Sequence, residues 1–278
     1  MSLKLMYITN NPSVARIAQD AGVDRIFIDM EYIGKEERQA GLNTVKLRHN
    51  IKDIENIRKV LTKSELLVRV NSIHNKTDKY CSSEEEIDNA INTGADVLML
   101  PMFKTAEDVK RFVQAVDGRA KVVLLLENRQ AVENLDEILN VDGIDEIHIG
   151  LNDLHLSYGM KFMFELLADG TVDRLCNKIH KKNIPYGFGG IARIGYGLLP
   201  AEYVIKEHYR LGSSCAILSR AFCNVDKIDE ISEIERIFNI EIKSIRNAEK
   251  YAESMTEKEF ENNHKTVVKL VNEIVEKM

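Results

Sequence analysis

Short apolar runs alternate along the chain with longer stretches of helical periodicity. Most of the runs are continuously apolar, which is typical of strands covered on both faces of a parallel sheet. We predict one strand for each run, at residues 4–9, 25–30, 65–70, 97–102, 121–127, 146–151, 184–189 and 215–220.

The stretches between these runs carry the signals of helix ends. Thr105 stands directly before a helical pattern, in the place of a capping residue. Ser83 with Glu86, and Thr256 with Glu259, match the capping box that opens a helix. Strands and helices are therefore expected to alternate through most of the chain.

This alternation predicts an α/β protein, a (β/α)8 TIM barrel with a C-terminal helical extension. The main alternative is an open doubly wound sheet, which would have a glycine-rich phosphate turn after an early strand. The segment TNNPS follows the first strand instead. We expect a catalytic barrel domain over residues 1–225 and a helical arm over residues 226–278, which packs either on its own barrel or on a neighbouring subunit.

Composition narrows the class of protein. The 278 residues are 44% hydrophobic and 29% charged, as in ordinary globular domains. The net charge of −6 argues against nucleic acid and anionic membranes as partners. No apolar run is long enough to span a bilayer or to form a signal peptide, and the four cysteines have no CxxC spacing. We expect a cytoplasmic protein with reduced thiols.

Barrel enzymes place their active sites at the carboxyl ends of the strands. Glu127 and Asp153 stand at the ends of two neighbouring predicted strands. Two carboxylates there can share one cation, and oxygen ligands favour Mg²⁺ or Mn²⁺ over zinc. The alternative is that both are ordinary polar residues at strand ends, one of them capping the next helix.

Arg69 ends the third predicted strand, where its guanidinium would enter the barrel mouth. A positive charge there can bind a substrate carboxylate or an oxyanion that develops during the reaction. A structural salt bridge to Asp29 or Glu31, which end the second strand, explains the same residue. The residue pattern leaves both interpretations open.

Five segments at strand ends, taken in order, resemble the hydroxyheptanedioate aldolase/citrate lyase β-subunit family across about residues 20–220. They are RIFIDMEY, LLVRVN, GADVLMLPMFKTAEDVKRFV, KVVLLLEN with AVENLDEIL, and IDEIHIGLNDLHLSYG. The resemblance implies a homo-oligomeric barrel enzyme whose C-terminal helices are often exchanged between subunits. It also implies Mg²⁺, Mn²⁺ or Co²⁺ held by Glu127 and Asp153, with Arg69 in the active site.

The implied reaction is that of a class II aldolase, a carbon–carbon lyase that cleaves or forms a 2-oxo-hydroxy acid through a metal-stabilised pyruvate enolate. Arg69 would stabilise the developing charge, and backbone amides near Asn152 and Asp153 would hold the substrate carboxylate. Arg193, in the loop after the seventh strand, would bind a second anionic group of the small-molecule oxo-acid substrate.

One position departs from the aldolases of that family, which commonly carry a catalytic histidine directly after the acidic motif of strand two. Tyr32 stands there, and tyrosine, with a pKa of about 10, is a poor base at neutral pH. Glu31, His155 or a water on the metal are the other candidates for the base. Two further functions stay open: a citrate-lyase-like acyl-thioester lyase, and a catalytically altered barrel that binds metal and oxo acid without turnover.

Overall fold

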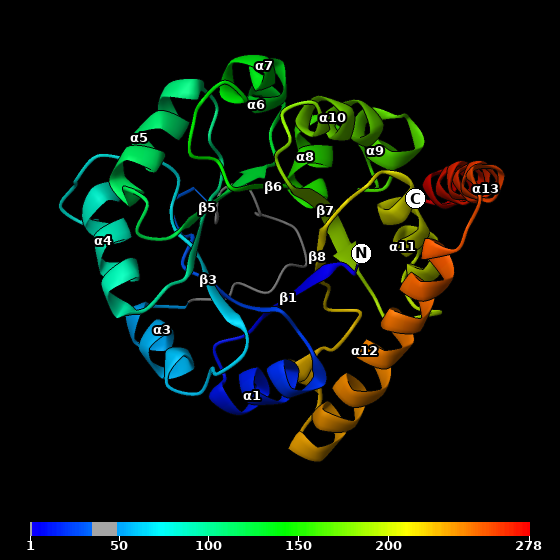
Figure 1. The fold of residues 1–278 in the computed structure, drawn as a ribbon, viewed down its shortest axis with the longest axis horizontal. Coiled ribbons are helices and arrows are strands. Elements are labelled where there is room, and N and C mark those ends of the chain that lie inside the picture. The colour runs from blue at the N-terminus through cyan, green and yellow to red at the C-terminus, as the bar shows by residue number, and fades with distance from the viewer. Residues whose placement is uncertain (1, 35–48) are drawn as a thin grey trace.

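The computed structural model describes residues 2–34 and 49–278 and confirms the predicted barrel. Eight parallel strands close into one ring in chain order, and β1 pairs with β8 (Figure 1). The strands are β1 (Lys4–Ile8), β2 (Arg25–Asp29), β3 (Glu65–Arg69), β4 (Val97–Leu100), β5 (Lys121–Leu126), β6 (Glu146–Ile149), β7 (Tyr186–Ile191) and β8 (Cys215–Leu218).

Helices cover the outside of this ring (Figure 1). Their apolar faces and the outward side chains of the strands form the main core. The helices are α1 (Pro12–Ala21), α3 (Ile51–Arg58), α4 (Ser83–Thr93), α5 (Ala106–Val116), α6 (Arg129–Glu133), α7 (Leu135–Ile138), α8 (Leu151–Ser157), α9 (Glu165–Ala168), α10 (Thr171–His180), α11 (Ala201–Arg210), the 3₁₀ turn η1 (Val225–Lys227), α12 (Ile231–Glu253) and α13 (Glu257–Glu276).

The start of α4 differs from the expected capping box by one residue. Ser82 and Glu85 form the box, whereas the sequence pattern had indicated Ser83 and Glu86. Ser83 and Glu86 lie on the buried face of the helix, and Glu86 accepts hydrogen bonds from the backbone and the side-chain amide of Asn71. The predicted pair therefore holds the loop after β3. The other expected caps, Thr105 and the Thr256–Glu259 capping box, are confirmed.

Inside the ring, side chains from the strands fill the barrel with an apolar layer. These residues pack on one another and are separate from the core between strands and helices: Met6, Phe27, Leu67, Val97, Met99, Val123, Leu125 and Cys215. Because side chains alternate along a strand, the layers above and below this one come from residues two positions away. The barrel is therefore a packed core whose polar groups lie at its two ends.

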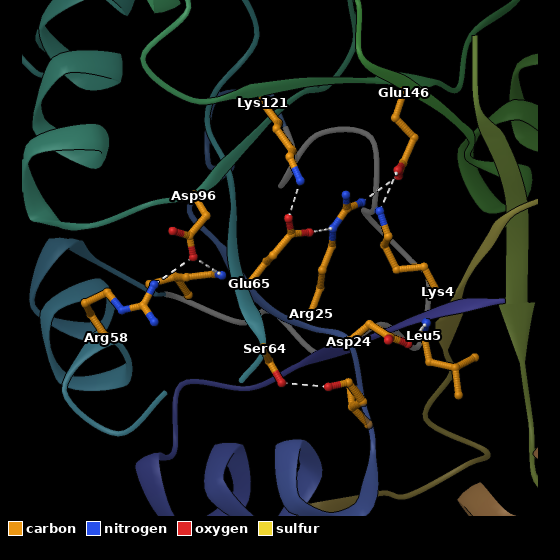
Figure 2. Close-up of polar contacts among 12 residues, drawn as sticks. Lys4, Leu5, Asp24, Arg25, Arg58, Ser64, Glu65, Asp96, Lys121 and Glu146 are labelled. Carbon is orange, nitrogen blue, oxygen red and sulfur yellow. Dashed lines mark hydrogen bonds and ion pairs between the residues drawn. The ribbon is translucent and has the colours of Figure 1, made fainter. Parts of the chain in front are cut away.

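An ion-pair network closes the amino-terminal end of the barrel (Figure 2). Arg25, 1% exposed, places Nη1 2.6 Å from Glu146 Oε1 and Nε 2.7 Å from Glu65 Oε2. Lys121 and Lys4 complete the pairing of these two glutamates. Burial by itself would raise the pKa of Glu65, but hydrogen bonds from Lys121 and Arg25 lower it to about 2.

A repeated backbone contact sets the register of alternate strands. Asp24, Asp96 and Asp145 each directly precede an even-numbered strand. Each carboxylate accepts a hydrogen bond from the second backbone N–H of the strand before: that of Leu5, Leu66 or Val122, at 2.8, 2.8 and 2.7 Å. The aspartate side chains thereby satisfy backbone N–H donors near the starts of these strands, at the floor of the barrel. Figure 2 shows the first of these contacts.

The two C-terminal helices lie against the barrel helices of the same chain (Figure 1). α12 contacts α1 and α11, and α13 contacts α9 and α11. Glu207 of α11 is fully buried, accepts a hydrogen bond from Asn263 Nδ2 at 2.8 Å and lies 3.0 Å from His264 Nδ1. The expected packing of this arm on a neighbouring subunit concerns an assembly and stays a prediction.

Across the described residues, no helix is both long and apolar enough to cross a membrane.

The floor network yields a stability prediction. Glu146→Gln should lower the free energy of unfolding by about 3 kcal/mol, because the buried charge of Arg25 loses one of its carboxylate partners. As a control, Asp136→Asn removes the exposed partner of Lys178 and should cost less than about 1 kcal/mol. Urea denaturation measures the free energy of unfolding of both variants. An equal loss of this free energy in the two variants would contradict the role of the buried network.

Candidate functional site

A cavity of about 1100 Å³ lies at the carboxyl ends of the strands. Residues at the ends of β2, β3, β5 and β6 line one side, and the segments after β8 and β1 line the other. Its lining includes Arg69, Glu127, Asn152 and Asp153 from the predicted site, together with Asp29. The chain thus brings residues from four strand ends into one space, as expected for a barrel enzyme.

Glu127 follows β5 directly and is 2% exposed. The backbone N–H of Met102 donates to its Oε1 at 3.1 Å. Burial raises the pKa of Glu127 well above its usual range, the charges of Glu31 and Asp153 raise it further, and Arg69 opposes them. Glu127 is therefore a buried carboxylate whose ionisation the negative charge of Asp153 opposes.

Asp153 lies in the first turn of α8, which begins directly after β6. Gly150, at the N-cap of that helix, faces Glu127 closely: a Cβ there would lie 2.9 Å from Glu127 Cβ and 3.2 Å from Glu127 Oε2. A side chain at this position would displace the glutamate. The glycine is therefore the reason that β5 and β6 can present their carboxylates in adjoining space.

The donor set of this pair fits a divalent cation. Two carboxylates that line one cavity, Glu127 buried and Asp153 half-buried, gain stability from a cation between them, and oxygen donors are those preferred by Mg²⁺ and Mn²⁺. Within residues 2–34 and 49–278, no group of three or more His, Cys, Asp or Glu side chains has metal-binding geometry. The protein would thus contribute only Glu127 and Asp153, leaving other coordination positions to substrate and water, as is common for Mg²⁺.

Arg69 forms the salt bridge that the sequence had left as one of two interpretations. Its Nε and Nη2 atoms each donate to Asp29, at 2.8 Å, and its Nη1 lies 3.5 Å from Glu31 Oε2. Burial alone would lower the pKa of Arg69, but Asp29, Glu31 and Glu127 raise it well above its ordinary value. Arg69 is therefore a permanent cation that lines the cavity while bound to Asp29.

The other predicted residues lie less centrally. Glu31 is 2% exposed and is not a lining residue of the cavity, although it lies beside Arg69. The ring of Tyr32 packs against the main core. Arg193 stacks on Tyr196 at 4.6 Å and lies outside the lining. The roles assigned to these residues stay predictions.

His155, a candidate base, is buried in α8 with its Nδ1 3.1 Å from the backbone oxygen of Leu151, and it does not line the cavity.

Sequence reasoning missed His49, which lines the cavity and is buried. The backbone N–H of Asp29 donates to His49 Nδ1 at 3.0 Å, so this nitrogen carries no proton in that contact. The histidine reaches the end of β2 from 20 positions further along the chain, through residues 35–48, which lie outside the described part. No local spacing in the sequence indicated it.

His148, on β6, also lines the cavity and escaped the sequence analysis. Its Nε2 lies 3.2 Å from the backbone oxygen of Gly189, and its Nδ1 lies 3.8 Å from the sulfur of Cys215. Burial lowers its pKa to about 4, which keeps the ring uncharged at neutral pH. Its place in an apolar strand run gave no functional signal.

Comparison with known proteins connects this geometry to an enzyme family. A family model described as HpcH/HpaI aldolase/citrate lyase matches residues 4–164. The 2-keto-3-deoxy-L-rhamnonate aldolase of Escherichia coli (strain K12) is 29% identical over 28% of this chain and 40% of the relative. That of Klebsiella pneumoniae subsp. pneumoniae is 32% identical over 26% and 39%. The chain thus spans about two fifths of the length of these curated relatives.

Solved structures share the fold. The HpcH/HpaI aldolase from Desulfitobacterium hafniense DCB-2 superposes with a TM-score of 0.60 at 16% identity, covering 83% of this chain and 95% of the other. A HpcH/HpaI aldolase/citrate lyase family protein from Burkholderia cenocepacia J2315 has a TM-score of 0.60 at 15% identity, with 84% and 94% covered. At these identities the likeness concerns the barrel alone.

The Arg69–Asp29 contact predicts a structural role that can be measured apart from activity. Arg69→Met should lower the free energy of unfolding by about 3 kcal/mol, because the buried Asp29 carboxylate loses its guanidinium partner. The double variant Asp29→Asn/Arg69→Met should recover part of that loss, since it removes both charges. Urea denaturation measures the free energy of unfolding of the single and the double variant. If both variants lose the same free energy, Asp29 and Arg69 are not coupled through the ion pair.

Proposed function

Because the chain belongs to the HpcH/HpaI aldolase/citrate lyase family, we propose that it is a class II aldolase, a metal-dependent carbon–carbon lyase. It cleaves or forms a 2-oxo-hydroxy acid by way of a pyruvate enolate. The observation that carries this proposal is the placement of Glu127 and Asp153 in one cavity, beside the guanidinium of Arg69.

Glu127 and Asp153 would hold the cation, with Mg²⁺ or Mn²⁺ favoured by their oxygen donors and Co²⁺ as a further possibility. The bound cation would supply a Lewis acid for the substrate oxygen on which charge develops. Gly150 supports this assignment, because any side chain there would push Glu127 out of place. Asp29, held by Arg69, keeps the neighbouring strand ends in position.

The start of α8 would bind the carboxylate of the oxo acid. The first N–H groups of a helix have no acceptor within it, and they carry a partial positive charge. No side chain caps this helix, whose N-cap is Gly150, so the amides of Asn152 and Asp153 are suited to an anionic ligand. The positive charge of Arg69, directed into the same cavity, would stabilise the enolate more than the ground state.

Proton transfer at the cleaved hydroxyl is the role proposed for Glu31 and Tyr32, which lie in the segment after β2. Glu31 is the better supported, because its carboxylate lies 3.5 Å from Arg69 Nη1, next to a residue that lines the cavity. The ring of Tyr32 packs against the core instead.

The C-terminal arm is proposed to join subunits of a homo-oligomer. Only Ser254, Met255 and Thr256 separate α12 from α13, and a short connection of this kind permits the exchange of α13 between identical barrels. The contacts from Glu207 to Asn263 and His264 would then form between chains. The free thiols of all four cysteines support a cytoplasmic location.

The function predicts an exchange reaction. With Mg²⁺ or Mn²⁺, the protein should exchange the methyl protons of pyruvate with deuterated water, because enolisation is the shared half-reaction of pyruvate aldolases. Glu127→Gln and Asp153→Asn should each lower the exchange rate by about 100-fold or more, as expected when a charge-stabilising group is lost. Proton NMR of the methyl signal measures the rate.

Glu137→Gln is the matched control, since Glu137 is exposed on α7 and outside the cavity. It should leave the exchange rate unchanged. Absence of exchange by the wild-type protein with every divalent metal would overturn the aldolase proposal. Full exchange by both Glu127→Gln and Asp153→Asn would overturn the assigned site.

The arm predicts a change in assembly. Removal of residues 256–278 deletes α13 and should lower the number of subunits measured by light scattering, because the exchanged contacts are lost. The point variant Glu207→Gln, which weakens the same contacts with α11, should shift the assembly in the same direction. An unchanged subunit number in the truncated protein would contradict the proposed exchange.

A further inference from the structure

We propose that Met102, in the loop between β4 and α5, is a positioning residue for the cation site. Its left-handed backbone holds its N–H against one oxygen of Glu127 and so leaves the other oxygen for the cation. This inference rests on the proposed function, which places a cation at Glu127, and deepens it by naming the group that orients this ligand. It begins from a backbone conformation that methionine disfavours.

Three described residues other than glycine have a positive φ: Met102 at 50°, Asp117 at 49° and Asn183 at 57°. Asp117 is the C-cap of α5 and Asn183 follows α10, and a left-handed residue commonly ends a helix. Aspartate and asparagine are also enriched in this conformation, because their short polar side chains bond locally. Met102 follows a strand instead and has no such side chain, so its conformation is imposed by the surrounding structure.

The chain on both sides of Met102 is fixed. Before it, β4 pairs with β5 up to the last residue of β4. After it, the backbone oxygen of Phe103 accepts a hydrogen bond from Asn128 Nδ2 at 2.8 Å. The backbone oxygen of Lys104 accepts one from Asn134 Nδ2 at 2.9 Å. The loop is therefore anchored to the segment that directly follows Glu127.

The N–H of Met102 donates to Glu127 Oε1 at 3.1 Å. Because the peptide groups are planar, the φ of Met102 sets the angle between this N–H and the anchored chain that follows. At an ordinary negative φ, either the N–H would turn away from Glu127 or the two anchors would detach. The left-handed conformation is thus the one that satisfies the anchors and Glu127 together.

The two oxygens of Glu127 have different surroundings. Oε1 accepts from Met102, whereas Oε2 accepts no hydrogen bond from the residues that the structure describes. Oε2 lies beside Gly150, where a Cβ would be 3.2 Å from it, and Gly150 is the N-cap of the helix that carries Asp153. A hydrogen bond to a carboxylate is strong and fixes its orientation. The Met102 contact therefore directs Oε2 toward the second proposed ligand.

The test measures Mn²⁺ binding to metal-free protein from the electron paramagnetic resonance signal of unbound Mn²⁺. Met102→Ile and Met102→Leu add isomeric apolar side chains that differ only in branching at Cβ, which makes a left-handed backbone costly. Met102→Ile should bind Mn²⁺ about tenfold more weakly than Met102→Leu, because loss of the hydrogen bond that orients a metal-binding carboxylate typically costs affinity on this scale.

A second pair repeats the comparison with polar side chains. Met102→Thr is branched at Cβ, whereas Met102→Asn introduces a residue that tolerates the left-handed conformation. Met102→Asn should bind Mn²⁺ at least as tightly as Met102→Leu, and Met102→Thr should bind it more weakly. Affinity would then follow backbone preference and not the polarity of the side chain.

Asp117 offers the matched control, since it is exposed, left-handed and outside the cavity lining. Asp117→Ile should lower the urea midpoint relative to Asp117→Leu, as Met102→Ile should relative to Met102→Leu. The two Asp117 variants should nevertheless bind Mn²⁺ with equal affinity. A loss of stability without a loss of affinity at this position separates strain from positioning.

Equal Mn²⁺ affinities within both Met102 pairs would overturn the inference. So would a loss shared by Met102→Asn and Met102→Thr but absent from Met102→Ile, which would assign the effect to side-chain polarity. Mn²⁺ binding by the wild-type protein without pyruvate exchange would refute the proposed function and leave the positioning role intact. Absence of Mn²⁺ binding by the wild-type protein would overturn both.

Discussion

Closure of the ring of parallel strands is the constraint on which the remaining features depend. β7 and β8 approach so closely that a Cβ at Gly187 would lie 2.0 Å from the backbone oxygen of Cys215. Only glycine permits that contact, and the pairing register shifts between Gly187 and Gly190 as the ring closes. Because every strand runs in the same direction, closure gathers all carboxyl ends at one rim. Residues as distant in the chain as Asp29 and Asp153 consequently share one cavity.

Electrostatics differ between the two ends of this barrel. At the floor, the carboxylates of Glu65 and Glu146 are matched by the cations of Arg25, Lys121 and Lys4. The apolar interior layer separates this network from the mouth. The floor network therefore serves stability, since its charges are satisfied within the protein.

At the mouth, Arg69 satisfies Asp29, whereas burial and the charges of Glu31 and Asp153 disfavour the charged form of Glu127. A buried carboxylate opposed by like charges costs stability unless a cation or substrate relieves it, which is typical of functional sites. Gly150 maintains this arrangement by leaving room for the Glu127 side chain. The proposed metal and the proposed substrate both follow from this imbalance of charge at one end of the barrel.

The sequence by itself determined the barrel, because continuously apolar strands between amphipathic helices have few other ways to bury both faces. It also located Glu127, Asp153 and Arg69, since strand ends in a barrel converge whatever the loops do. Only the tertiary structure decided that Arg69 is bound to Asp29, because the choice among neighbouring carboxylates depends on side-chain directions. It alone brought His49 to the end of β2, since contacts made by loops depend on packing across the ring and have no local period in the sequence.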